Sequence, residues 1–149
     1  PRSASSAPTA NTATIVIGAF VAGLRAGLAY NTFPLMAGQW VPDGLLTLAP
    51  AWRNLFENPT MVQFVHRCLA LTTLALIGFL WLRLARAGLD RGQRRALNAL
   101  LAMGLVQVAL GIATLLWGVP VLLGTLHQGG AVLLLSAVLV LAHRGVPAR

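Results

Sequence analysis

The stretch PTMVQFVHRCLALTTLALIGFLWLRL, residues 59–84, decides the fold of this chain. A helix needs about 20 mostly apolar residues to cross a bilayer, and this stretch supplies them without a single acidic residue. Asn58 and Pro59 mark its start, because asparagine caps helix N-termini and proline suits the first helical position. The stretch therefore predicts a membrane-spanning helix.

The rest of the chain has the same apolar character. Of its 149 residues, 57% are hydrophobic and only 9% are charged, whereas a soluble domain carries about 25% charged residues. We therefore predict an all-α integral membrane protein, an antiparallel bundle of four transmembrane helices with a long outer loop between the first two. The expected helices are residues 12–30, 59–84, 96–117 and 120–143, within one domain of residues 12–144. Residues 1–11, rich in Ser, Ala, Pro and Thr, are expected to be a disordered tail or linker.

Arginine accounts for all eleven basic residues, and its distribution predicts the topology. Five arginines mark the connection between the second and third helices: Arg83, Arg86, Arg91, Arg94 and Arg95. The positive-inside rule places this connection in the cytoplasm, and the even number of helices puts both termini on the same side. In a bacterial host this membrane would be the cytoplasmic membrane. Despite a net charge of +8, this pattern indicates contact with membrane lipid and no nucleic-acid partner.

The connection between the first two helices lies on the outer side in this topology. It contains four prolines together with Trp40 and Trp52, whose amphipathic rings suit the membrane interface. A loop of this length is usually functional or disordered. Cys68 is the only cysteine of the chain, so neither an intrachain disulfide nor a cysteine-rich metal site is available, and we expect it to be a small core residue.

Two histidines lie at matching depth in the second and fourth helices. His66 follows its expected helix start by about seven residues, as does His127 after Pro120, so at about 1.5 Å per residue both lie roughly 10 Å below the outer ends. The two helices run in the same direction, as in a weak internal repeat of two helix pairs. Ionisable side chains within a span are costly, and they usually face the bundle interior, where they pair or bind a ligand.

A shared heme is the ligand that this pair fits. A zinc site needs three or four protein ligands, and the few acidic residues lie in loops, whereas heme iron takes its two axial ligands from the protein and accepts imidazole. His66 and His127 are therefore the expected axial ligands of a heme iron. The alternative is that each histidine only hydrogen-bonds across the bundle. Three glycines, Gly18, Gly104 and Gly111, we interpret mainly as points of close helix packing.

Two arginines near the outer side are candidate partners of the anionic heme propionates. Arg25, about five residues before the expected end of the first helix, should lie near the histidine layer, where it either pairs with a propionate or extends to the interface. Arg67, next to His66, either does the same or pairs with Glu57 in the outer loop. His143, at the cytoplasmic end, is expected to be solvated or interfacial.

Several strings of residues resemble those of a known family. Residues 18–27 read GAFVAGLRAG and run into YNTFPLM at residues 30–36. Asn58, VQF followed by His66 and Arg67, GIATL at residues 111–115, and LHQ at residues 126–128 come in the same order as in that family. Together they resemble the C-terminal half of heme A synthases of the proteobacterial and mitochondrial type, over nearly the whole chain after Asn11.

The resemblance implies an oxidoreductase of heme biosynthesis, which oxidises the C8 methyl of heme O to the formyl of heme A for cytochrome oxidase. It also implies two four-helix halves, of which the C-terminal one holds a heme b between the residues matching His66 and His127. The present sequence lacks a second histidine pair, so we expect no catalytic residue in it, no activity from this chain alone, and an electron-relay or supporting role. Expected partners are heme, the N-terminal half of the enzyme, and heme O synthase or cytochrome oxidase assembly factors, with homo-oligomerisation left open.

Two other functions remain open at this point. One is a free-standing membrane cytochrome b that transfers electrons through the same bis-histidine heme. The other is a cofactor-free membrane scaffold in which the histidines only stabilise packing, and this hypothesis predicts colourless purified protein.

Overall fold

The regular structure of the chain is helical. The computed structural model describes residues 6–144, with helices α1 (Ser6–Gly23), α2 (Asn54–Glu57), α3 (Pro59–Ala85), α4 (Arg91–Leu116) and α5 (Val121–Arg144), and the short 3-10 helices η1 (Ala26–Leu28) and η2 (Ala51–Arg53). These residues form no strand, apart from one isolated bridge between Met36 and Gln39. Within the described part, three helices are long and apolar enough to cross a membrane: α3, α4 and α5. The predicted all-α class is confirmed.

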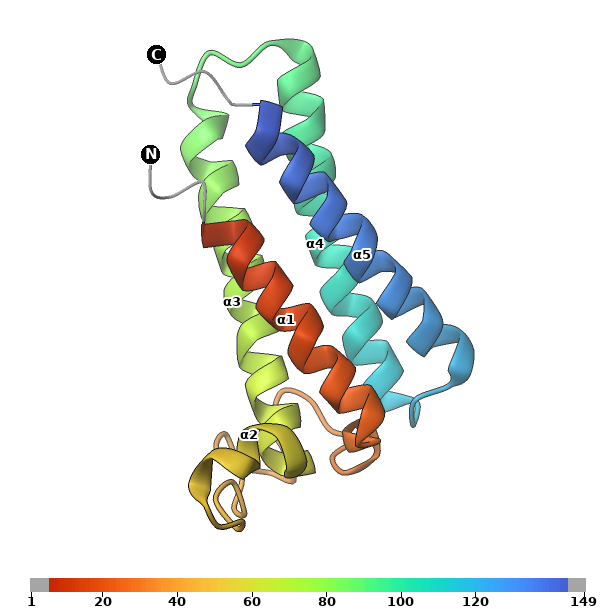
Figure 1. Ribbon diagram of the computed structural model, residues 1–149. Helices are drawn as coiled ribbons and strands as arrows, with labels where there is room; N and C mark the ends of the chain where they lie inside the picture. The colour runs from red at the N-terminus through yellow and green to blue at the C-terminus, as the bar shows by residue number, and fades with distance from the viewer. Residues whose placement is uncertain (1–5, 145–149) are drawn as a thin grey trace.

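Four long helices lie side by side, with α2 and the outer loop gathered at one end (Figure 1). α1 packs on α3, α3 on α4, α4 on α5, and α5 on α1, so the contacts form a closed ring. The start of α1 and the end of α5 lie at the end of the α3–α4 connection, opposite the outer loop and the α4–α5 turn (Figure 1). α3 and α5 therefore run in the same direction, with their first turns at the loop end.

The first helix differs most from its expected bounds. α1 begins at Ser6, inside the expected tail, because Pro8 falls in the first turn, where its missing N–H costs no helical hydrogen bond. It ends at Gly23, because Arg25 adopts a left-handed φ of 51° through which a right-handed helix cannot continue. The expected end at residue 30 is therefore wrong, and the chain passes into η1 instead.

The other helices begin and end closer to their expected bounds. α3 and α5 agree with the prediction to within one residue at each end. α4 begins at Arg91 instead of residue 96, because Asp90 and Gln93 form a capping box. Oδ1 of Asp90 accepts from the Gln93 amide at 2.8 Å, and Oε1 of Gln93 accepts from the Asp90 amide at 3.1 Å. A capping box satisfies two N–H groups at a helix start, which explains the earlier start.

The apolar core lies toward the α3–α4 connection. Ile77, Leu100, Leu134 and Val138, from three helices, are each at most 5% exposed and pack into one cluster. Gly104 lets α4 approach α3 here, because a Cβ at this position would lie 3.4 Å from Cδ1 of Ile77. The close packing predicted for this glycine is confirmed. The half of the bundle nearer the outer loop carries the histidines instead.

Two buried asparagines organise the outer loop. Oδ1 of Asn54 accepts from the backbone N–H groups of Thr47 and Leu48, both at 3.0 Å. Asn58 donates from Nδ2 to the carbonyl of Gly44 at 2.7 Å and to Oδ1 of Asn54 at 3.0 Å. Its own Oδ1 accepts from the N–H groups of the first turn of α3, so the predicted N-cap is confirmed. The loop is therefore attached to the helix that carries His66.

We expect Asn58→Ala to destabilise the chain markedly. It removes a helix cap, which contributes about 1 kcal/mol, and takes away the buried hydrogen bond to Asn54, which contributes about 0.5–1.5 kcal/mol. Asn58→Ser keeps the cap and loses only the loop contacts, so its loss should be smaller. Thermal unfolding in detergent, followed by circular dichroism, measures both. Equal midpoints for the parent and the alanine variant would contradict the expected role.

Candidate functional site

His66 of α3 and His127 of α5 approach one another across the bundle. Their ring centroids are 6.4 Å apart and their planes are nearly perpendicular, at 87°. An imidazole nitrogen lies about 2 Å from the metal it binds, so two rings on opposite sides of one metal ion have their centroids about 6 Å apart. The spacing of this pair therefore fits two ligands that share one metal atom.

Each imidazole ring lies against a glycine of the neighbouring helix. A Cβ added to Gly18 of α1 would lie 3.0 Å from Cε1 of His66, and a Cβ added to Gly111 of α4 would lie 2.9 Å from Cε1 of His127. A side chain at either position would press on the ring. The same contact between a glycine and an imidazole ring occurs in the α1–α3 pair and in the α4–α5 pair. Besides allowing helix packing, Gly18 and Gly111 therefore leave the space that the two rings occupy.

Gln107 of α4 gives His127 a second contact. Nε2 of Gln107 lies 3.0 Å from Nδ1 of His127 and donates to the His127 carbonyl at 2.6 Å. Nδ1 of His66, in contrast, is buried and forms no hydrogen bond with any residue between 6 and 144. The sequence analysis missed Gln107. The available signal was its spacing of four residues from Gly111, which places both on one face of α4.

The donor set around the pair limits the kind of metal site. Among the residues that the structure describes, no three or more His, Cys, Asp and Glu side chains gather where they could hold a metal ion. A structural zinc site needs four such ligands and a catalytic one needs three. The iron of a heme takes its four equatorial bonds from the porphyrin and only the axial ones from the protein. Two histidines are too few for a zinc site, but they are enough to supply the protein ligands of a heme iron.

Arg67 holds the start of the outer loop. Nη1 donates to the Thr32 carbonyl at 2.8 Å and Nη2 to the Tyr30 carbonyl at 3.0 Å. The pairing of Arg67 with Glu57 is wrong, because Glu57 forms an ion pair with Arg53. Hydrogen bonds from Arg53 lower the pKa of the Glu57 carboxyl. Nε of Arg67 is buried and has no partner within the described range.

Gln63, one turn before Arg67 in α3, is a second polar residue that the sequence analysis missed. Its side chain is 2% exposed, and Nε2 donates to the Tyr30 carbonyl at 3.0 Å. Gln63 and Arg67 therefore hold the same carbonyl of the segment that follows η1. These two hydrogen bonds attach the start of the outer loop to the first turns of α3, the helix that carries His66.

Arg25 lies farther out than the sequence suggested. α1 ends at Gly23, and Arg25 follows Gly18, the residue that faces His66, by seven positions. Arg25 therefore lies beyond the end of α1, on the outer side of the histidine layer and not within it as expected. The side chain is exposed at the outer end of the bundle and makes no hydrogen bond to a described residue.

Two other expectations concern residues away from the pair. Cys68 is exposed on α3, so its interpretation as a core residue is wrong. It follows His66 by two positions, and this places it on another face of the helix. His143 lies in the last turn of α5, and its side chain falls outside the side chains that the structure describes. Its expected exposure therefore stays a prediction.

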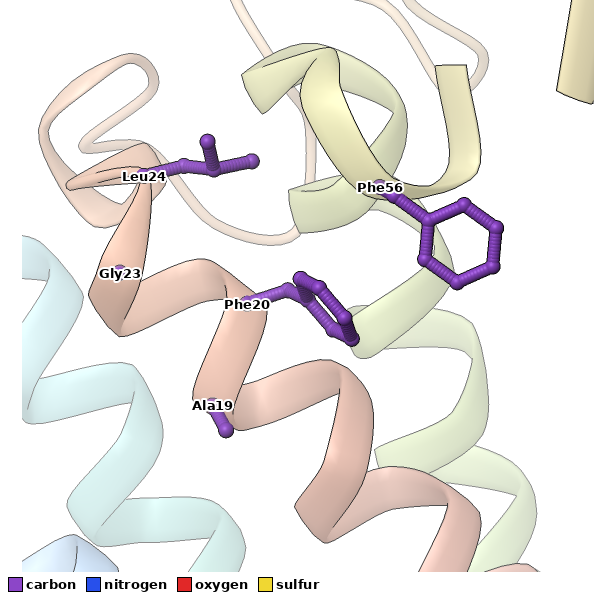
Figure 2. Close-up of a pocket in the computed structure, with 5 residues that line it drawn as sticks. All are labelled: Ala19, Phe20, Gly23, Leu24 and Phe56. Carbon is purple, nitrogen blue, oxygen red and sulfur yellow. The ribbon is translucent and has the colours of Figure 1, made fainter. Parts of the chain in front are cut away.

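An apolar pocket lies at the outer end of α1, apart from the histidines. It is lined by Ala19, Phe20, Gly23, Leu24 and Phe56. Figure 2 shows Phe20 and Leu24 projecting from the end of α1 and Phe56 from α2. The rings of Phe20 and Phe56 meet edge to face, with centroids 5.4 Å apart. No titratable side chain lines this pocket.

Comparison with known proteins relates the chain to one family. The model of the family described as cytochrome oxidase assembly protein, COX15-CtaA, matches residues 2–139. Heme A synthase COX15 of Mus musculus is 50% identical over 136 residues, which cover 90% of this chain and 33% of the mouse protein. Heme A synthase of Nitrosospira multiformis is 49% identical over 129 residues, covering 87% of this chain and 36% of that protein. The chain thus spans about a third of the length of these relatives. No solved structure matches it.

Proposed function

Because the chain belongs to the COX15-CtaA family of cytochrome oxidase assembly proteins, we propose that it is the heme b-binding part of a heme A synthase. The observation that carries this proposal is the histidine pair, whose rings are 6.4 Å apart and are each seated on a glycine. Relatives with about half of the residues identical, named heme A synthase, support the same assignment. His66 and His127 are the proposed axial ligands of the heme iron.

The proposed role of this part is electron transfer or structural support. A heme held by two protein ligands supplies one-electron oxidation and reduction, with no axial position left open for a substrate. The oxidation of the C8 methyl of heme O to the formyl of heme A is therefore assigned to another part of the longer enzyme, and no catalytic residue is assigned here. This chain alone is expected to be inactive. Its proposed partners are the N-terminal half of the enzyme and heme O synthase or cytochrome oxidase assembly factors.

The proposed membrane arrangement is an antiparallel bundle of four spans, with the outer loop between the first two. α1 is the proposed fourth span, although its apolar segment Pro8–Gly23 is shorter than the other three. The arginine-rich α3–α4 connection lies at the same end as the start of α1 and the end of α5 (Figure 1). By the positive-inside rule this end is cytoplasmic. The proposed location is the bacterial cytoplasmic membrane, or the mitochondrial inner membrane in a eukaryote.

A visible spectrum of the detergent-purified chain tests the proposal. We expect a reduced-minus-oxidised signal of a low-spin b-type heme, and a pyridine hemochrome assay should give about one heme per chain. Colourless protein after growth with added heme precursor would contradict the proposal and favour a scaffold. Co-expression with the remainder of a related synthase separates a synthase part from a free-standing cytochrome b, because only the first restores conversion of heme O.

Arg25 and Arg67 are the proposed contacts to the heme propionates. Arg25 is an exposed guanidinium at the outer rim, and Arg67 keeps an unpaired Nε beside His66. We expect Arg25→Gln to keep the heme but to lower its midpoint potential, because a nearby positive charge favours the less positive, reduced iron. Arg25→Lys keeps the charge and should stay close to the parent. A redox titration that does not distinguish the glutamine variant from the parent would count against this role.

A further inference from the structure

We propose that Gln107 positions His127, so that the two histidines are unequal ligands, with His127 the more firmly oriented one. This inference rests on the proposed heme site and adds to it a residue that acts through the ligand. Nε2 of Gln107 touches His127 twice, at Nδ1 (3.0 Å) and at the backbone carbonyl (2.6 Å). The two contacts fix both the orientation of the ring and its place along α5.

The chemistry of a ligating imidazole explains why such a contact matters. A neutral histidine that binds a metal through Nε2 carries its proton on Nδ1, and this N–H almost always has an acceptor. The Gln107 carboxamide has one group of each kind: its nitrogen donates to an unprotonated Nδ1, and its oxygen accepts from a protonated one. In the structure the carboxamide nitrogen lies at Nδ1 and also donates to the His127 carbonyl. For Nε2 to bind iron, Nδ1 must carry the proton, and the carboxamide must turn so that its oxygen accepts from Nδ1.

The carboxamide is itself confined by the helix that it contacts. Gly130 lies one turn after His127 on α5, and a Cβ at this position would collide with Oε1 of Gln107. Gly111, four residues after Gln107 on α4, lies against the His127 ring. Gly111, Gly130 and Gln107 together restrict the movement of the His127 imidazole, and Gly130 also restricts the Gln107 carboxamide.

The His66 ring lies against a glycine, as the His127 ring does, but no glutamine contacts it as Gln107 contacts His127. Gly18 faces its ring, while Nδ1 is buried and has no hydrogen-bond partner in the described part of the chain. The Thr14 backbone lies near His66, but it makes no hydrogen bond of good geometry with Nδ1. Since a second contact orients a metal ligand, His127 is the better oriented ligand of the two.

The test compares Gln107→Leu and Gln107→Glu with the parent chain. Gln107→Leu removes both contacts at similar volume, and we expect heme affinity to fall about 10–100-fold, the usual cost of losing the partner of a metal-ligating histidine. Gln107→Glu keeps an acceptor for Nδ1–H, so it should retain most of the affinity, and its negative charge should lower the midpoint potential. Asn98→Leu is the matched control, because Asn98 lies on the same helix and its side chain accepts from Trp81, away from the pair.

A second readout does not require heme. In the chain labelled with 15N-histidine in detergent, Gln107→Leu should shift the ring-nitrogen resonances of His127 and leave those of His66 unchanged. Unchanged His127 resonances, or an unchanged heme affinity in Gln107→Leu, would overturn the proposal. If the parent itself bound no heme, the proposed function would fail, whereas the resonances would still decide whether Gln107 orients His127.

Discussion

His127→Ala is expected to abolish the low-spin heme signal of the purified chain, and His66→Ala should do the same. Each histidine supplies one of the only two bonds that the protein makes to the proposed heme iron. Loss of a ligand should therefore cost more than the about 10–100-fold in affinity that follows loss of a ligand's hydrogen-bond partner. The measurement is the heme content by pyridine hemochrome, together with the reduced-minus-oxidised spectrum.

The third histidine provides the control for this experiment. His143→Ala changes the same residue type near the opposite end of α5, and it should leave the heme content and spectrum unchanged. If both ligand variants kept the spectrum of the parent, the assignment of His66 and His127 as axial ligands would be wrong. If only one of the two variants lost the heme signal, the histidine replaced in the other variant would not be an axial ligand.

Gly111→Ala should have the second largest effect. The new Cβ would lie 2.9 Å from Cε1 and 3.3 Å from Nε2 of His127, so the ring must move, and its contact with Gln107 prevents an easy retreat. We expect most of the low-spin signal to be lost, with a shift toward high-spin iron because one axial bond is weakened. The optical spectrum and electron paramagnetic resonance of the purified variant measure this change.

Other glycines of the bundle show whether the effect is specific to the histidine seat. Gly124→Ala is the matched control, since no atom lies within 4 Å of its added Cβ and alanine favours a helix over glycine by up to about 1 kcal/mol. Gly18→Ala should have a smaller effect than Gly111→Ala, because its Cβ would lie 3.0 Å from the His66 ring and no hydrogen bond holds Nδ1 of that ring. Equal spectra for the Gly111 and Gly124 variants would show that Gly111 is not needed to position the His127 ring.

The sequence by itself determined α3, α5 and the depth of the histidines that they carry. Long apolar stretches are helical in lipid because every backbone N–H and C=O must find a partner within the segment, so α3 and α5 were predicted to within one residue. The Asn58 cap was predictable because it depends on residues adjacent in the chain. The matching depth of His66 and His127 follows from counting residues from each helix start at a constant rise.

The tertiary structure alone decided which side chains these residues meet. Arg67 bonds the carbonyls of Tyr30 and Thr32, which precede it by more than thirty residues, and this contact depends on the path of the outer loop. Glu57 pairs instead with Arg53, four residues before it. The seating of His127 by Gly111 and Gln107 likewise arises only where α4 packs on α5. Contacts between helices depend on their rotation and spacing, which hydrophobic periodicity constrains only weakly when lipid surrounds the bundle.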